Sequence, residues 1–173
     1  MTALGGVVAA AALLAVAAGV AKARSPGSAV RAMRAIGWPT SSALVRTGAV
    51  LEATLGVVVL VVGSWAPVVV LAASYAGFTC FNAAAIRADS IAPCGCFGDG
   101  SAQTGWRHVW FDAACAVALV IAAATGTPSA LQMVRTSAAY GIATVVVAGV
   151  GAWLAATYLS GRLTGSIAGL ADA

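Results

Sequence analysis

The sequence predicts an all-α, polytopic membrane protein, a bundle of five transmembrane helices that forms a single membrane domain over residues 1–173. Two observations predict this class. Hydrophobic residues make up 61% of the 173 residues and charged residues only 8%, whereas a typical soluble domain has about 45–50% and about 25%. The apolar residues also form five runs, each close to the roughly 20 residues that cross a hydrocarbon core.

The low charge content excludes an ordinary soluble domain, a disordered tail and a nucleic-acid-binding protein. The chain has 9 Lys+Arg and 5 Asp+Glu, a net charge of +4, which in a soluble protein would suggest nucleic acid. Here the cations flank the apolar runs, as membrane anchors do. We therefore expect the lipid bilayer, and no nucleic acid, as the partner of this surface.

Each expected span is a mostly apolar run, and the connections between spans are of unequal length. The first run has no basic segment before it and does not resemble a cleaved signal peptide. Short connections follow the second and fourth runs, so the second and third runs form a hairpin. The expected spans are about 2–21, 47–63, 67–86, 106–124 and 138–159.

The first long loop, residues 22–46, carries five cations and no acid. Within it, about 28–36 places Val30, Met33 and Ile36 on a different side from Arg31 and Arg34. That spacing predicts a short helix lying in the membrane interface. The alternative is a plain basic loop, because short amphipathic patterns also arise by chance.

The second long loop, residues 87–105, contains the string Pro93-Cys94-Gly95-Cys96-Phe97-Gly98. With five crossings, both long loops lie on the same face of the membrane, and we expect them to approach each other. The polar residues of the helices cluster toward this face, which predicts an active end of the bundle. The residues expected there are Arg31, Arg34, Arg46, Glu52, Cys80, Asn82, Cys94, Cys96, His108, Asp112 and Cys115.

Cys94 and Cys96 are the candidate catalytic residues. Two thiols separated by one glycine can close a small, strained disulfide ring, and strained disulfides exchange more readily. Cations close to the loop would increase the fraction of reactive thiolate. One alternative is a metal site, but Cys-x-Cys supplies only two of the four ligands of structural zinc, and no metal site is predicted. The other alternative is a pair of structural cysteines in a turn.

Cys80 and Cys115 lie within apolar runs, where a free cysteine commonly behaves as a small hydrophobic side chain. They are expected at a similar depth below the face that carries the loop thiols. A second thiol pair, or a resolving thiol that relays to the loop, is therefore the functional alternative.

Glu52 and Asp112 are acids inside membrane spans, so each is expected to face the bundle and to have a partner. Arg46, or another cation of the first loop, is the expected partner of Glu52. His108, Asp112 and Cys115 follow at i, i+4 and i+7, on one stripe of a helix. Such a stripe could move protons during thiol chemistry, and its structural alternative is a set of groups that fix the packing.

Glycines surround Glu52 on its own helix. Gly48 and Gly56 lie four residues before and after it. Small residues at this spacing predict a face on which another helix can approach closely.

The string Cys94-Gly95-Cys96-Phe97-Gly98 after a third membrane helix resembles the methylamine-utilisation MauE family. Glu52 followed by Leu55-Gly56, the basic stretch after the first span, and Asp112 after Trp106-Arg107-His108 also resemble it. The resemblance covers about 4–124. It implies a four-helix core related to the DoxX membrane proteins, to which this chain adds one helix.

The resemblance also implies a function. MauE-like proteins are similar in architecture to the thiol oxidoreductases DsbB and vitamin K epoxide reductase, which implies thiol–disulfide exchange between Cys94 or Cys96 and a thioredoxin-like partner. The chain would then be a thiol–disulfide oxidoreductase. No definite cofactor is indicated. A quinone is implied only by a weak analogy, because this sequence lacks the Cys-x-x-Cys of those enzymes.

The distribution of cations predicts an orientation in the inner (plasma) membrane of a bacterium. Eight cations adjoin the face of the two long loops, and Arg135 alone adjoins the other. The positive-inside rule then places the amino terminus outside and the cysteine loop in the cytoplasm. This orientation weakens an oxidative role and favours a reductive or structural one. The competing functional class is a non-catalytic accessory subunit of a larger membrane complex, such as a transporter, which suits a small chain of Gly- and Ala-rich helices.

Overall fold

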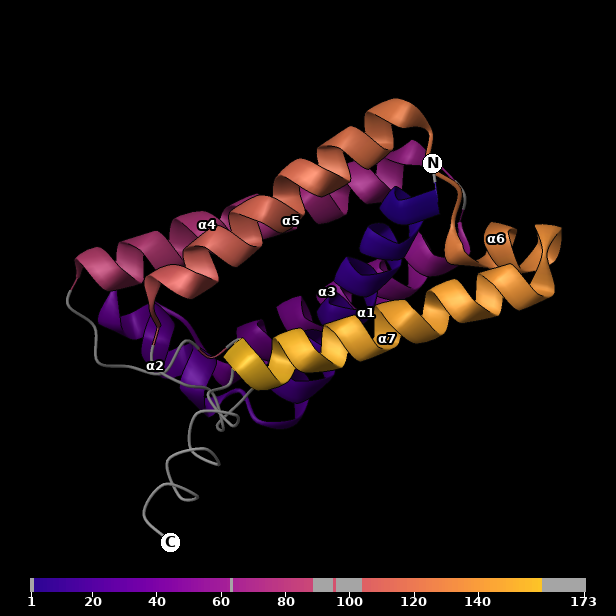
Figure 1. The fold of residues 1–173 in the computed structure, drawn as a ribbon. Helices are drawn as coiled ribbons and strands as arrows, with labels where there is room; N and C mark the ends of the chain where they lie inside the picture. Colours follow the sequence, from indigo (N-terminus) through magenta and orange to yellow (C-terminus); the bar gives the residue numbers. More distant parts are fainter. Residues whose placement is uncertain (1, 63, 89–94, 96–103, 160–173) are drawn as a thin grey trace, which may run out of the picture.

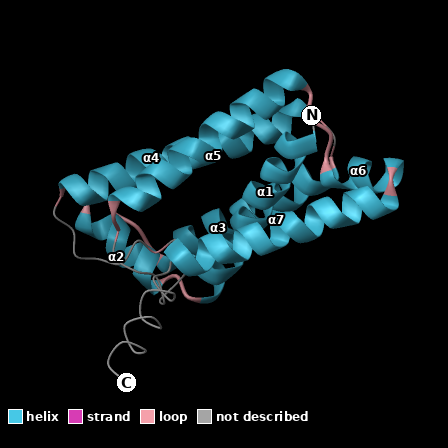
Figure 2. Cartoon of the chain, viewed as in Figure 1, coloured by secondary structure: helices cyan, strands magenta, loops and turns pink. Residues whose placement is uncertain are grey.

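The computed structural model describes residues 2–62, 64–88, 95 and 104–159, and all regular secondary structure within them is helical (Figures 1 and 2). Five helices are long and apolar enough to cross a membrane. The predicted all-α, multi-pass fold class is confirmed. The five long helices are α1 (Thr2–Arg24), α3 (Ser42–Val61), α4 (Trp65–Arg87), α5 (Trp106–Thr125) and α7 (Ala138–Leu159).

Two short helices lie at opposite ends of the bundle (Figure 1). Helix α2 (Gly27–Ala35) adjoins the end at which α4 and α7 finish, and α6 (Ala130–Thr136) adjoins the other end, near the amino terminus. Helix α6 was not expected from the sequence. It begins at a capping box in which the Ser129 hydroxyl accepts from the Gln132 N–H and the Gln132 side chain accepts from the Ser129 N–H, so Ser-x-x-Gln was the available signal.

Two helices are longer than their hydropathy indicated. Two cations that were expected in the first long loop therefore lie inside helices. Helix α3 begins at Ser42 rather than near residue 47, because the Ser41 hydroxyl accepts a hydrogen bond from the Leu44 N–H at 3.2 Å and caps it. Arg46 therefore lies inside α3. Helix α1 continues to Arg24, so that Lys22 lies in its last turn.

Helix α1 is the most central element, since it packs against α3, α5 and α7, while α4 packs mainly against α5. Its buried face consists largely of alanine, including Ala11, Ala12 and Ala15. Small side chains let neighbouring helices approach closely, and in lipid this packing replaces much of the hydrophobic driving force. The core is completed by larger side chains from the other helices, among them Leu71 and Leu119.

The close approach of α1 and α3 depends on two glycines. A Cβ atom at Gly19 would lie 2.5 Å from the Ala49 carbonyl oxygen, and one at Gly56 would lie 2.6 Å from that of Ala12. The expectation of a close approach at Gly56 is confirmed. At Gly48 it is wrong, because a Cβ there would meet nothing within 4 Å.

Helix α2 occupies the segment for which an amphipathic helix was expected, and the plain basic loop is excluded. Ala29 and Val30 are buried, while Arg31 and Arg34 are exposed. The Arg34 guanidinium donates to the Thr40 carbonyl oxygen at 3.0 Å. This bond secures the connection from α2 to α3.

Substituting Gly56 by alanine should destabilise the bundle, whereas the same change at Gly48 should not. Overpacking at Gly56 is expected to cost about 1–3 kcal/mol of unfolding free energy. Gly48→Ala should be neutral or stabilise by up to about 1 kcal/mol, since alanine is the better helix former. Denaturant unfolding of both variants in micelles measures the difference. Equal stabilities would show that the α1–α3 contact does not limit packing.

Candidate functional site

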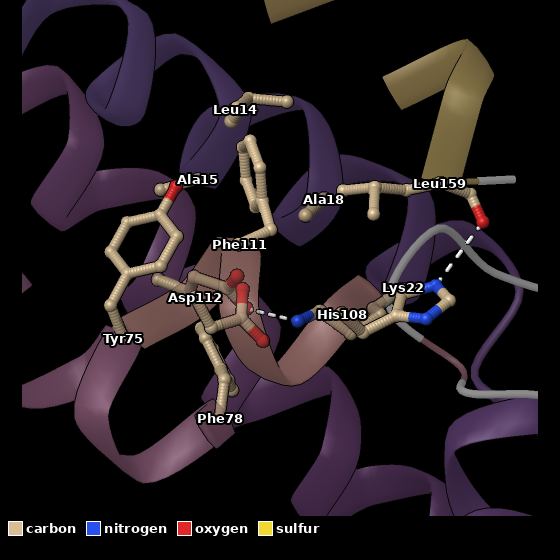
Figure 3. A pocket seen from close by; sticks show the side chains of 11 residues that line it. Leu14, Ala15, Ala18, Lys22, Tyr75, Phe78, His108, Phe111, Asp112 and Leu159 are labelled. Atoms are coloured by element: carbon tan, nitrogen blue, oxygen red, sulfur yellow. Dashed lines mark hydrogen bonds and ion pairs between the residues drawn. The ribbon is translucent and has the colours of Figure 1, made fainter. Parts of the chain in front are cut away.

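A small cavity of about 40 Å³ lies inside the bundle, and all five long helices contribute to its wall (Figure 3). Its polar side chains come from α1, α3, α4 and α5, and α7 contributes its last residue. The chain thus gathers polar groups from distant parts of the sequence in an otherwise apolar interior. The lining residues are Leu14, Ala15, Ala18, Lys22, Glu52, Tyr75, Phe78, His108, Phe111, Asp112 and Leu159.

Lys22 and Glu52 form an ion pair at one side of this cavity. The Lys22 Nζ lies 2.5 Å from Glu52 Oε2, and the two side chains are only 12% and 10% exposed. The same ammonium lies 4.8 Å from the centre of the Phe78 ring, within the range of a cation–π contact. Lys22 therefore joins α1 to both α3 and α4.

Asp112 and Asn82 form a second buried pair, between α5 and α4. The Asn82 Nδ2 donates to Asp112 Oδ2 at 2.8 Å. Asn82 is fully buried, and Asp112 is 9% exposed. An amide donor stabilises the carboxylate without placing a second full charge in the interior.

His108 connects the start of α5 to the end of α7. Its Nε2 lies 3.2 Å from the Leu159 carbonyl oxygen, and its Nδ1 lies 3.3 Å from the Gly105 backbone nitrogen. A neutral ring satisfies both contacts when Nε2–H donates to Leu159 and Nδ1 accepts from the Gly105 N–H. The ring is 2% exposed, so His108 is part of the interior and not of the membrane surface.

The structure brings together some of the predicted residues and separates others. Glu52, Asp112 and His108 line the cavity. Arg46 is exposed on α3, and the partner of Glu52 is Lys22, the first cation of the loop expected from the sequence. Sequence reasoning did not single out Lys22, although it is the only lysine of the chain.

Tyr75 was also missed. Its hydroxyl donates to the Ala11 carbonyl oxygen at 2.9 Å and is buried between α4 and α1. A tyrosine in the middle of an apolar run was the signal, since a buried hydroxyl requires a partner.

Cys80 and Cys115 are free thiols in different surroundings. Cys80 is exposed on α4, whereas Cys115 is partly buried and packs against the hydrophobic core. Neither lines a cavity that contains the polar groups above. Cys115 shares its helix stripe with Asp112, as the sequence spacing indicated.

Cys94 and Cys96 lie outside the described residues, but Gly95 between them is described. It is buried and has a φ angle of +70°, in the left-handed region that favours glycine. A Cβ atom at this position would lie 2.6 Å from the Ala29 Cα. The expected approach of the two long loops is confirmed at this point, where Gly95 packs directly on α2.

A second cavity, of about 260 Å³, lies beside Gly95. Three aromatic rings line it, and two of them, Trp38 and Phe81, have centres 6.1 Å apart. Lys22 and Phe78 line this cavity and the smaller polar one. The residues around it are Lys22, Ala29, Met33, Trp38, Ser74, Gly77, Phe78, Phe81 and Gly95.

No group of three or more His, Cys, Asp or Glu side chains that could hold a metal ion occurs within the described ranges.

The family model described as methylamine utilisation protein MauE matches residues 1–126. The chain belongs to the MauE family. The match includes α1 to α5 and the Cys-Gly-Cys loop, while α6 and α7 follow it. Searches of the curated proteins and of the solved structures each gave no significant match.

Breaking the Lys22–Glu52 pair from one side should destabilise this MauE protein more than removing both charges. Lys22→Met leaves a buried carboxylate without its cation, at an expected cost of about 3–5 kcal/mol. The double variant Lys22→Met/Glu52→Leu should recover most of that loss, because both desolvation penalties disappear. Unfolding free energies of the single and double variants form the measured cycle. Additive effects would contradict a direct interaction between the two side chains.

Proposed function

We propose that this MauE-family membrane protein is a thiol–disulfide oxidoreductase that exchanges electrons through Cys94 and Cys96 with a thioredoxin-like partner. The observation that carries the proposal is the position of Gly95. Its backbone packs against Ala29 of α2. It also borders the second cavity, called the aromatic cavity here because three aromatic rings line it. The glycine between the two thiols is therefore anchored to the bundle.

The chemistry requires only the two thiols and the partner's disulfide. The thiolate of one cysteine attacks a sulfur of the partner, so that a mixed disulfide forms, the partner's S–S bond breaks, and the leaving thiolate takes up a proton. The second cysteine then attacks the mixed disulfide and releases the reduced partner. Two electrons pass to the partner, and Cys94 and Cys96 end as a disulfide. The reverse sequence reduces the loop again.

We also propose that the chain lies in the inner membrane of a bacterium with this loop on the cytoplasmic side. Exposed arginines gather at the end of the bundle that carries α2, among them Arg24, Arg31, Arg34 and Arg87. Arg135 lies in α6, at the other end. The positive-inside rule assigns the arginine-rich end to the cytoplasm, where thiol exchange runs in a reductive environment.

A second candidate function, that of an accessory subunit in a larger membrane complex, is favoured by the surface between α1 and α7. An open groove of about 530 Å³ runs there and is lined by small residues, including Gly6, Ala10 and Gly151. Small residues allow a transmembrane helix of another protein to approach. If co-purification yields a large complex whose activity survives Cys94→Ser/Cys96→Ser, the accessory role replaces the redox role.

Cys94 and Cys96 should form a reversible disulfide. Alkylation of the purified protein before and after reduction, followed by mass spectrometry, should show a change of two thiols within one peptide. Cys80 and Cys115 serve as internal controls and should remain free in both states. If all four thiols stay alkylatable in oxidising buffer, the redox mechanism is wrong.

Gly95→Ala should slow thiol exchange, while Gly37→Ala should not. Both glycines have positive φ angles, of 70° and 83°, so both substitutions introduce similar backbone strain. Only at Gly95 would the new Cβ also collide with Ala29, whereas it would meet nothing within 4 Å at Gly37. Displacement of the loop is expected to reduce the exchange rate by about ten- to a hundred-fold. The rate with a thioredoxin-like protein is the measurement, and equal rates for the two variants would show that the Gly95 contact is not required.

A further inference from the structure

The amide of Asn82 has one partner too few in the described structure. Its Nδ2 donates to Asp112, but its Oδ1 is buried and has no hydrogen-bond partner among the described residues. A buried acceptor left without a donor destabilises the folded state. The thiol chemistry proposed above makes no use of this group.

A half-turn of the Asn82 side-chain amide exchanges the positions of its NH₂ group and its oxygen. The exchange determines which protonation state of Asp112 the amide can hydrogen-bond. In the described orientation an NH₂ group faces the carboxyl and suits a carboxylate, which only accepts hydrogen bonds. After the half-turn Oδ1 faces the carboxyl, and a protonated carboxyl can donate to it. The Asn82–Asp112 contact thus provides one hydrogen bond to either protonation state of Asp112.

The neighbouring cavity provides a route for the proton. Its volume of about 40 Å³ exceeds the roughly 10–15 Å³ that one water molecule requires. Asp112, Glu52 and Lys22 all line it, and they supply the two to four polar partners that a buried water molecule needs. Water in this cavity would connect the carboxyl of Asp112 to the Lys22–Glu52 pair.

Every helix packed around Asp112 has a defined group facing the cavity. Helix α1 contributes the Lys22 ammonium and α3 the Glu52 carboxylate, which offset each other's charge. Helix α4 contributes the Tyr75 hydroxyl, which is bonded to a backbone carbonyl. On α5 itself, His108 contacts Leu159 of α7 and Gly105, and Cys115 follows Asp112 by one turn.

We propose that Asp112 and Asn82 form a proton-binding site inside the bundle, which exchanges its proton through water and the Lys22–Glu52 pair. Lys22 also lines the cavity beside Gly95, so the pair lies between the site and Gly95. One part of the inference rests on the proposed function: the site accepts the proton of the attacking thiol and returns it to the leaving thiolate, with no net change.

Infrared titration of the full-length protein in micelles tests the site without any partner. A band of a protonated carboxyl group should appear as the pH falls, should be lost in Asp112→Asn, and should move in frequency in Asp112→Glu. Glu52→Gln removes a negative charge and leaves the Lys22 cation, so the band should be weaker at the same pH. Thr79→Val, a change on α4 that removes only a bond to the Tyr75 carbonyl, should leave the band unchanged.

Access through the cavity is tested by exchange into D₂O. Ala18→Val narrows the cavity from α1 and should slow the isotope shift of the Asp112 band while leaving the band itself in place. The proposal is overturned if no band assignable to Asp112 titrates while the helices remain folded, or if Glu52→Gln leaves the band unaltered. The same titration in Cys94→Ser/Cys96→Ser should still show the band, so a failure of the thiol chemistry is distinguishable from a failure of the proton site.

Discussion

The ion pair between Lys22 and Glu52 is the constraint on which the arrangement of this bundle depends. Two charges in an apolar interior are tolerated only when they meet each other. Their contact therefore fixes the rotation of α1 and α3 about their own axes. The same rotation turns Gly19 and Gly56 into the interface, where the two backbones approach so closely that no Cβ atom would fit.

Polar contacts of this kind position the remaining helices as well. Helices in a membrane gain little from the hydrophobic effect when they associate, so side-chain hydrogen bonds and close packing select one arrangement among many. Asn82 joins α4 to α5, Tyr75 joins α4 to α1, and His108 joins α5 to α7. Most of these groups also line the polar cavity. The residues that define the fold are therefore the ones that give the interior its chemistry.

Helix α2 and Gly95 extend this organisation beyond the spanning helices. The backbone of Gly95 rests on Ala29, and Lys22 reaches from the polar cavity to the aromatic cavity beside that contact. The Lys22 side chain therefore borders both the cavity that holds the buried carboxyls and the cavity beside Gly95. This proximity is the physical basis for coupling thiol exchange to proton binding in our proposals.

The sequence by itself determined the five spans, because an apolar run of sufficient length in lipid can satisfy its backbone only as a helix. It also determined that Glu52 and Asp112 face the interior and that the two long loops share one face. Only the tertiary structure decided that Glu52 pairs with Lys22 rather than Arg46, because Arg46 is exposed on α3 while Lys22, in the last turn of α1, contacts Glu52. It likewise decided that Gly56 and not Gly48 contacts α1, since the rotation of a uniformly apolar helix is set by its neighbours and not by its own hydropathy.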